Sequence, residues 1–417
     1  MKESMTSLQS KSRTGKNRIS LNWNQLNAVI AGVSAIDLPS LAIRTRGDAR
    51  NFAREYGFDV DSPLALEEIT RVHREAVTFI ETNFLTPSQR ALVSEDVRNP
   101  GNVLDLLVYS SNHLNKSNLK QQWSCAVLKV MHGIFHIDHD SKLMYFDEIR
   151  KQIFDSIDKV IFEDEDGRHF LKDGTTMIPL FKFQKKRNKG RQSVLLKLLQ
   201  KPSYVASDIY DHLGIRLVFE TKAECLFALK HLRRCHLLTV TNIKPFRSRN
   251  NLVDMKSSKK IFNRFKPLLN RTEGYPTEVL KRIDEELEAS YIRRSRDNNP
   301  HSSIDFRAIQ ITARKMIRIA NPLYRQLQDL IGFVSGKIDL PQDLLPKAES
   351  ARDLSFYFDF ELQLLDRKSY EASLHGPASH DAYKKRQLET AGKRVLGPVL
   401  EKYLEEQDAA EKGETGD

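Results

Sequence analysis

The chain has few cysteines and no long apolar run. Its 417 residues include an odd and scattered set of three cysteines, Cys125, Cys225 and Cys235, without the spacing of metal ligands. A reducing compartment is therefore expected, and a disulfide framework is not. No apolar stretch is long enough to cross a bilayer, and the polar N-terminal residues lack the apolar core of a secretory signal. We expect a soluble, cytoplasmic protein with no membrane partner.

Acidic residues are scarce relative to basic ones. The chain carries 66 Lys and Arg against 55 Asp and Glu, which gives a formal net charge of +11. No Asp or Glu occurs between Met177 and Pro202. This balance indicates a polyanionic partner, which can be a nucleotide, a nucleic acid or an anionic surface.

Composition and periodicity divide the chain into segments. Residues 1–20 are polar and are expected to be disordered, and residues 21–170 show the periodicity of an all-α domain. Residues 171–398 alternate strand and helix patterns, with an insertion at 247–303, and predict an α+β domain with a mixed sheet of about five strands. Residues 399–417 are acidic and are expected to form a disordered tail.

Local patterns predict the individual elements. Pro63 after Ser62 marks a helix start, because proline suits the first helical position. Further helices are expected over 104–108, 123–137, 193–199, 223–235 and 277–290, and from 377 onward. Strands are expected over 176–185, 215–220, 236–244, 306–311 and 356–364.

A histidine cluster lies in the helical half. His132, His136 and His139 are close in sequence, and His139-Asp140 resembles the metal-binding pair of HD hydrolases. That fold also needs an earlier His and a later Asp on separate helices, for which the sequence has only nominal candidates. Histidines of a core or a surface are the commoner interpretation, and the metal site is the alternative.

A basic turn joins the strand pattern at 176–185 to the helix pattern at 193–199. It contains Arg187 and Lys189, and the helix adds Ser193 and Lys197. Cations and a hydroxyl at a helix N-terminus suit a polyphosphate. The alternative is a solvated basic turn.

Two carboxylates are candidates for a metal site. Asp211 precedes the strand that contains Gly214 and Arg216, where a carboxylate can hold Mg²⁺. Glu361 and Gln363 share one face of an alternating strand. A second carboxylate facing Asp211 would complete a metal site or act as a general base. The alternatives are a turn-capping Asp and an ordinary solvent-facing strand.

The last motif is His380, Tyr383 and Lys384, which share one side of a helix. It can also be the rim of an amphipathic helix.

In this order, the motifs resemble the synthetase domain of the RelA/SpoT family of nucleotide pyrophosphokinases over residues 176–390. That family reads Arg-x-Lys-x-x-x-Ser with a following Lys, then Asp-x-x-Gly-x-Arg, then Glu-x-Gln, then His-x-x-Tyr-Lys. The resemblance implies a nucleotidyltransferase-like domain.

The resemblance also implies roles for the matched residues. Arg187, Lys189 and Lys197 would hold the phosphates of ATP, the donor, and Asp211 with Glu361 would hold Mg²⁺. Glu361 would also act as base toward an acceptor hydroxyl, which attacks the β-phosphorus and releases AMP. The remaining matches would bind nucleotide: Ser193, Arg216, Gln363, His380, Tyr383 and Lys384.

The family's third motif, a strand with a guanine-stacking Tyr and a later His, is matched only in part. Phe306 stands in place of the Tyr, Gln310 in place of the His, and Leu365 where an Arg follows Glu-x-Gln. Phe306 keeps an aromatic face for stacking. The departures fall on the acceptor side and leave the acceptor open. Its phosphates would be bound by Arg293, Arg294 or Arg296.

Three functions remain open from the sequence. The first is transfer of pyrophosphate from ATP to the 3′-hydroxyl of a guanine or other purine nucleotide, as in alarmone synthesis. The second uses the same chemistry on an RNA acceptor such as a tRNA 3′ end, which the basic insertion favours. The third is a degenerate protein that binds nucleotide or RNA to regulate a partner. The presence of Asp211 and Glu361 argues against the third.

Overall fold

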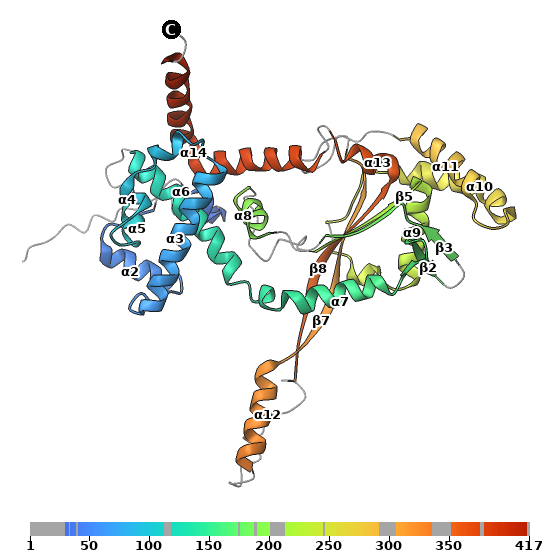
Figure 1. The fold of residues 1–417 in the computed structure, drawn as a ribbon, viewed down its shortest axis with the longest axis horizontal. Coiled ribbons are helices and arrows are strands. Elements are labelled where there is room, and N and C mark those ends of the chain that lie inside the picture. Colours follow the sequence, from blue (N-terminus) through green and yellow to red (C-terminus); the bar gives the residue numbers. More distant parts are fainter. Residues whose placement is uncertain are drawn as a thin grey trace, which may run out of the picture.

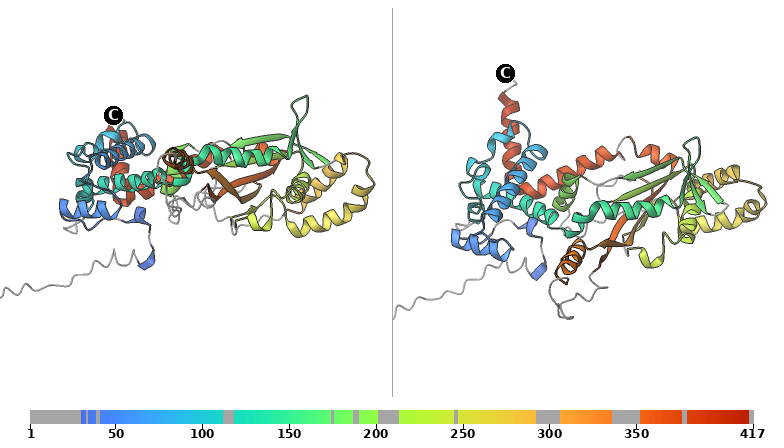
Figure 2. Two further views of the ribbon diagram at one scale, coloured as in Figure 1. Left: turned by 90° about the horizontal axis from the view of Figure 1, so that it is seen from below. Right: turned by 60° about the horizontal axis from the view of Figure 1, so that its bottom comes forward.

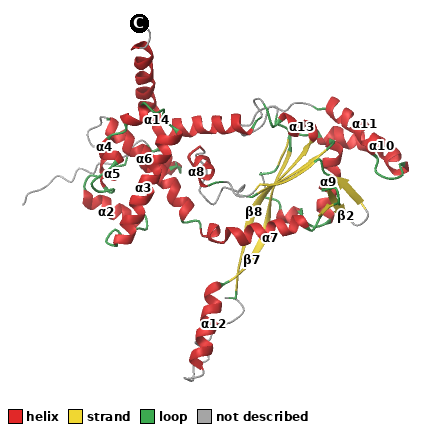
Figure 3. Ribbon diagram, in the orientation of Figure 1, coloured by secondary structure: helices red, strands yellow, loops and turns green. Residues whose placement is uncertain are grey.

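The computed structural model describes residues 30–32, 34–38, 41–111, 118–173, 176–186, 190–200, 213–244, 247–291, 306–335, 352–375 and 379–414. Over these ranges the fold is α+β, with a five-stranded mixed sheet and a separate three-stranded antiparallel sheet. A helical body lies at one end of the molecule and the sheets at the other (Figures 1 and 3). None of the described helices has both the length and the apolar composition needed to span a membrane. The expected disorder of residues 1–20 falls outside the described residues.

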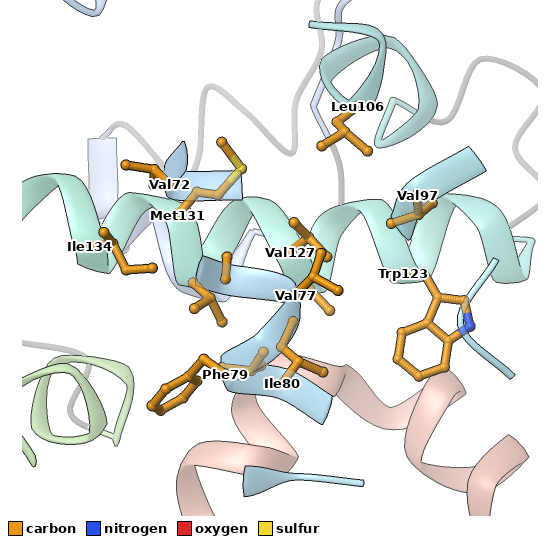
Figure 4. Packing of buried hydrophobic residues seen from close by; sticks show 14 of the residues in the cluster. Val72, Val77, Phe79, Ile80, Val97, Leu106, Trp123, Val127, Met131 and Ile134 are labelled. Atoms are coloured by element: carbon orange, nitrogen blue, oxygen red, sulfur yellow. The ribbon is translucent and has the colours of Figure 1, made fainter. Parts of the chain in front are cut away.

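The helical body is built around two long helices. Helix α3 (Pro63–Asn83) begins with Ser62 at its N-cap position and Pro63 in its first turn, as predicted. It packs along α6 (Leu119–Asp138), and Figure 4 shows the apolar side chains packed between these helices and their neighbours, with Trp123 at one side. The body also contains α2 (Arg46–Glu55), α4 (Glu95–Arg98), α5 (Asp105–Tyr109) and the short helices η1 (Ala35–Asp37) and η2 (Gln89–Leu92). The short helix η3 (Ser141–Tyr145) follows α6 and contacts the next helix, α7 (Phe146–Asp158).

A helix from the second half of the sequence completes this body. Helix α8 (Arg191–Gln200) matches the helix expected over 193–199 and packs against α6. Leu195 and Leu199 of α8 are buried in the same hydrophobic cluster as Trp123. Gly133 of α6 permits the close approach, because a Cβ atom there would lie 2.7 Å from Leu195 Cδ1.

The end of the chain also joins the helical body. Helix α14 (His380–Glu414) bends at Gly397, whose φ of 78° is unfavourable for other residues, and continues past it (Figure 1). Beyond the bend, Leu400 and Leu404 are buried in the cluster. The disordered tail expected over 399–417 is therefore wrong for residues 399–414. The acidic composition suggested a tail, but two apolar residues one helical turn apart decided the structure.

The five-stranded sheet has the order β4 (Lys182–Lys186), β5 (Gly214–Phe219), β8 (Asp353–Asp366), β7 (Ile309–Ala320) and β6 (Arg249–Asn250). Strands β5 and β8 are parallel, and the other pairs are antiparallel. One face of the sheet is apolar and is covered by α7 (Phe146–Asp158) and α9 (Lys222–Arg234). The prediction of a mixed sheet of about five strands is confirmed.

The remaining elements surround this sheet. Strands β7 and β8 continue beyond the other strands as a two-stranded ribbon that carries α12 (Pro322–Ser335) away from the body (Figures 1 and 2). The other elements are β1 (Ile161–Glu163), β2 (His169–Asp173), β3 (Thr176–Pro179), η5 (Val240–Asn242), α10 (Met255–Arg271), α11 (Thr277–Ala289) and α13 (Arg367–Ala372).

Two predicted strands differ from the structure. The strand expected over 176–185 is two strands, β3 and β4, which belong to different sheets and are separated at Leu180. The segment 236–244 was expected to be a strand but begins with His236 at a φ of 57° and contains η5. Only Ile243 makes a bridge, to Ala313 of β7. The strand predicted over 236–244 is therefore wrong, and the one predicted over 176–185 is interrupted by Leu180 and Phe181.

A pH dependence of stability arises in the helical body. His132 Nδ1 lies 2.6 Å from Tyr56 Oη, and burial lowers the pKa of His132 to about 4. The pKa of a histidine in an unfolded chain is about 6.5. Between these values the unfolded chain binds a proton that the folded chain does not, so stability falls as the pH falls. We expect His132→Gln to reduce this fall in a urea denaturation series at several pH values. An unchanged pH dependence in His132→Gln would contradict this assignment.

Candidate functional site

The second face of the five-stranded sheet is polar. Residues paired in register point to the same side of a sheet. One such row crosses all five strands and consists of Gln184, Arg216, Gln363, Gln310 and Arg249. Neighbouring residues such as Ile215 and Leu362 point into the apolar core instead. The row therefore lies on the face turned away from α7 and α9.

Hydrogen bonds join three predicted site residues on this face. Arg216 Nε and Nη2 donate to Gln363 Oε1 at 3.0 and 2.9 Å, and Gln363 Nε2 donates to Glu361 Oε2 at 2.8 Å. Burial lowers the pKa of Arg216, and the nearby Tyr370 and Glu361 oppose that shift. Among the described residues, the second carboxylate oxygen, Glu361 Oε1, has no hydrogen-bond partner. The Glu361 carboxylate is thus oriented by one oxygen and open at the other.

The next row places a cation beside this carboxylate. Lys186, Gly214, Glu361 and Thr312 are paired in register, so their side chains share the polar face. A Cβ atom on Gly214 would lie 3.5 Å from Lys186 Cβ, so Lys186 lies close over the glycine. Asp211 lies outside the described residues, and its distance to Glu361 stays a prediction.

An aromatic cluster closes the other end of the polar face. Phe306 packs with Tyr370, Val218, Ala308 and Leu365. Leu365 is fully buried there, two residues beyond Gln363 on the same face. Two of the three departures from the family pattern, Phe306 and Leu365, are therefore in one cluster. There an apolar Leu packs against an aromatic ring, whereas a charged Arg would be desolvated.

Hydrogen bonds fix the backbone on both sides of Phe306. Asn251 Nδ2 donates to the Phe306 carbonyl at 2.6 Å, and the Ala308 amide donates to Asn251 Oδ1 at 2.8 Å. Arg307 is held by Glu288, at 2.8 and 2.9 Å, and lies over the Tyr291 ring at 3.8 Å. Phe306 is half-buried, so an edge or face of its ring remains open to a ligand.

Other predicted residues lie on helices α8 and α14. Ser193 and Lys197 are on α8, and His380, Tyr383 and Lys384 are in the first turns of α14. Figure 1 shows α8 beyond the end of the sheet at which β4 ends and β5 begins.

Hydrogen bonds join these two helices. Gln387 Nε2 of α14 donates to Gln200 Oε1 of α8 at 2.8 Å and to Tyr383 Oη at 2.9 Å. Arg191, in the same basic stretch, is bound to Glu75 and Asp138, so it anchors α8. Arg187, Lys189, Arg293, Arg294 and Arg296 lie outside the described residues.

Several residues of the polar face were missed from the sequence. Lys182, Gln184 and Lys186 alternate with Phe183 along β4, and that alternation was the available signal. Lys182 Nζ lies 5.2 Å from the Tyr370 ring centroid, and the Arg216 guanidinium 5.9 Å from it. Arg249 gave no signal, because β6 has two residues.

The histidine cluster has other partners. His139 Nδ1 is 2.9 Å from the Phe135 carbonyl, and His73 Nε2 is 2.9 Å from the Val97 carbonyl. In the part of the chain that the structure describes, no three His, Cys, Asp or Glu residues are grouped so that they could hold a metal ion. The HD-type interpretation gains no support from these contacts.

The polar face offers a fixed carboxylate among cations, next to an aromatic cluster. No protein-family model matches this chain, and no curated protein matches its sequence. The chemistry that the polar face can support therefore follows from its own residues. Glu361 Oε1 can take a metal ion or accept a proton, while Lys186 and Arg216 can neutralise phosphate charge. Tyr370 and Phe306 can accommodate a base.

Removal of Gln363 tests the hydrogen-bonded set. We expect Gln363→Leu to lower the free energy of unfolding by about 1–3 kcal/mol, because Arg216 would lose its buried acceptor. Gln310 lies in the same row, but its side chain makes no hydrogen bond to a described residue. Gln310→Leu should therefore change the free energy of unfolding by no more than about 0.5 kcal/mol. Urea denaturation measures both, and equal losses would contradict a specific role of Gln363.

Proposed function

We propose that this chain is a nucleotide pyrophosphokinase of the RelA/SpoT type with a nucleotidyltransferase-like domain. It would transfer pyrophosphate from ATP to the 3′-hydroxyl of a guanine or other purine nucleotide. The main support is the hydrogen-bonded set of Arg216, Gln363 and Glu361. Arg216 and Gln363 belong to two motifs that are 147 residues apart in the sequence, yet they meet on one face of the sheet.

In the proposed reaction, Glu361 is the general base. Gln363 holds one oxygen of its carboxylate, and Oε1 accepts the proton of the acceptor hydroxyl. The hydroxyl oxygen then bonds to the β-phosphorus, the bond from that phosphorus to the AMP oxygen breaks, and AMP leaves. Lys186 and Arg216 neutralise charge that develops on the phosphate oxygens.

Mg²⁺ would be held by Glu361 together with Asp211. Carboxylate oxygens are the ligands that Mg²⁺ prefers, and the ion would supply positive charge against the phosphates of the donor. ATP phosphates would bind Arg187, Lys189, Ser193 and Lys197. The remaining nucleotide contacts would come from the polar face and from α14. Phe306 and Gln310 lie on the polar face. His380, Tyr383 and Lys384 lie on α14.

Incubation of the pure protein with ATP labelled at the γ-phosphate tests this function. The acceptors offered are guanine nucleotides, other purine nucleotides and total tRNA, with and without Mg²⁺. Mg²⁺-dependent transfer of label to a purine nucleotide is expected. Label on RNA would instead support the RNA acceptor, and no transfer to any acceptor would support a non-enzymatic binding protein.

A further inference from the structure

Helix α10, in the insertion between β6 and β7, has a cationic solvent face. The helix contains no acidic residue and begins and ends in exposed positions. Successive residues of a helix are rotated by about 100° around its axis. Over less than half of the circumference of α10, every residue is a Lys, an Arg, an Asn or Pro267. The α10 cationic face is defined by Lys256, Lys259, Lys260, Asn263, Arg264, Lys266, Asn270 and Arg271.

The opposite side of α10 is used for packing. Ile261 and Phe265 are buried in the core of the sheet domain, and Phe262 lies edge-on to Phe227 of α9 at 5.6 Å between centroids. An interfacial membrane helix inserts an apolar face into the lipid. That face of α10 is occupied by protein, so a lipid surface is not the favoured partner.

The charge of the α10 cationic face is largely uncompensated. Among the described residues, the only ion pair of this face joins Arg264 to Glu286 of α11. Asp254 precedes the helix, but its side chain accepts a hydrogen bond from the Ser257 amide as an N-cap. Five cations thus lie along about 22 Å of helix with no ion-pair partner in the described part of the chain, which is an arrangement suited to a row of phosphates.

We propose that the α10 cationic face binds the phosphate backbone of single-stranded RNA. Asn263 and Asn270 place amide donors and acceptors between the cations, where they can contact ribose 2′-hydroxyl groups. The same segment brings Asn251 to the backbone of Phe306, so the N-terminus of α10 lies close to an aromatic ring on which a base can stack. This binding does not require the proposed transfer reaction.

Fluorescence anisotropy with a labelled single-stranded RNA, in the absence of ATP and Mg²⁺, tests the proposal. The test variant carries Lys256→Gln, Lys259→Gln and Lys260→Gln. For single strands the logarithm of affinity falls with the logarithm of salt by about 0.7 per phosphate contact, so three lost contacts should reduce that slope by about 2. We expect RNA affinity at low salt to fall by about tenfold or more.

A matched variant changes the net charge equally elsewhere. Lys151→Gln, Lys393→Gln and Lys402→Gln remove exposed lysines that are paired with Asp155, Glu401 and Glu406. This variant should bind RNA as the unmodified protein does, and circular dichroism should show both variants folded. Equal losses in both variants, or unchanged binding in the α10 variant, would overturn the proposal. Equal affinity for DNA of the same sequence, or binding to anionic vesicles but not to RNA, would overturn the assignment to RNA.

Discussion

Glu361→Gln is expected to reduce pyrophosphate transfer by about 10²–10⁴-fold, the usual contribution of a general base. The amide keeps the size of the side chain and can still accept the hydrogen bond from Gln363. It cannot accept a proton from the acceptor hydroxyl, and it binds Mg²⁺ poorly because it carries no charge. Initial rates with labelled ATP measure the loss.

Asp359→Asn is the matched control for this substitution. Asp359 lies two residues from Glu361 on the same sheet face and pairs with Lys244 at 3.0 Å. The change in charge and size is the same, but the residue has no assigned role, so transfer should stay within a few-fold of the unmodified rate. Transfer retained in Glu361→Gln would show that the base is elsewhere. Similar losses in both variants would point to the charge of the face rather than to one carboxylate.

Lys222→Met is expected to lower the free energy of unfolding by about 3–5 kcal/mol, the usual cost of breaking a buried ion pair. The Lys222 side chain is 1% exposed, and its Nζ lies 3.2 Å from Asp366 Oδ2 and 3.1 Å from Glu288 Oε2. Asp284 Oδ2 follows at 3.7 Å. Without the ammonium group, three carboxylates would face one another, and that of Asp366 is itself 1% exposed. Urea denaturation near neutral pH measures the change.

Two further variants separate the ion network from simple packing. Lys222→Met with Asp366→Leu removes both charges, so it should cost less than Lys222→Met alone. Lys402→Met, which breaks an exposed pair with Glu406, should cost no more than about 1 kcal/mol. A loss of this small size in Lys222→Met would contradict the network.

The network also has an alkaline limit. Burial lowers the pKa of Lys222, but attraction to Asp366, Asp284 and Glu288 outweighs it and raises the pKa overall. The stabilisation is therefore complete below the unfolded value, about 10.4, and is lost as the pH rises through the folded value.

Periodicity sufficed to predict most helices and the polar face of β8. Glu361 and Gln363 alternate with apolar residues, and such alternation places them on one face whatever the rest of the fold is. Their contact with Arg216 was not predictable in the same way. Arg216 and Gln363 are 147 residues apart, and their contact depends on the parallel register of β5 and β8, which no local pattern sets.

The structure of residues 399–414 depends on tertiary packing and could not be predicted from composition. Residues 399–414 are typical of a solvated acidic segment, because charged and polar residues outnumber the apolar ones around Leu400 and Leu404. They become significant only when α6 offers a surface for α14 to cover. Likewise, the leucines of α8 predict a helix but not the body that it packs against.

The position of α8 and α14 in the helical body has a consequence for how the protein is made. Synthesis releases the N-terminal residues first, yet the surface of α6 is complete only after Leu404 has been added. Until then, an apolar stripe on the nascent chain has no native partner while the whole sheet domain is translated. The core of the helical body is therefore completed only after the sheet domain has been translated. Premature termination before α14 would leave the stripe permanently exposed and produce an aggregation-prone product.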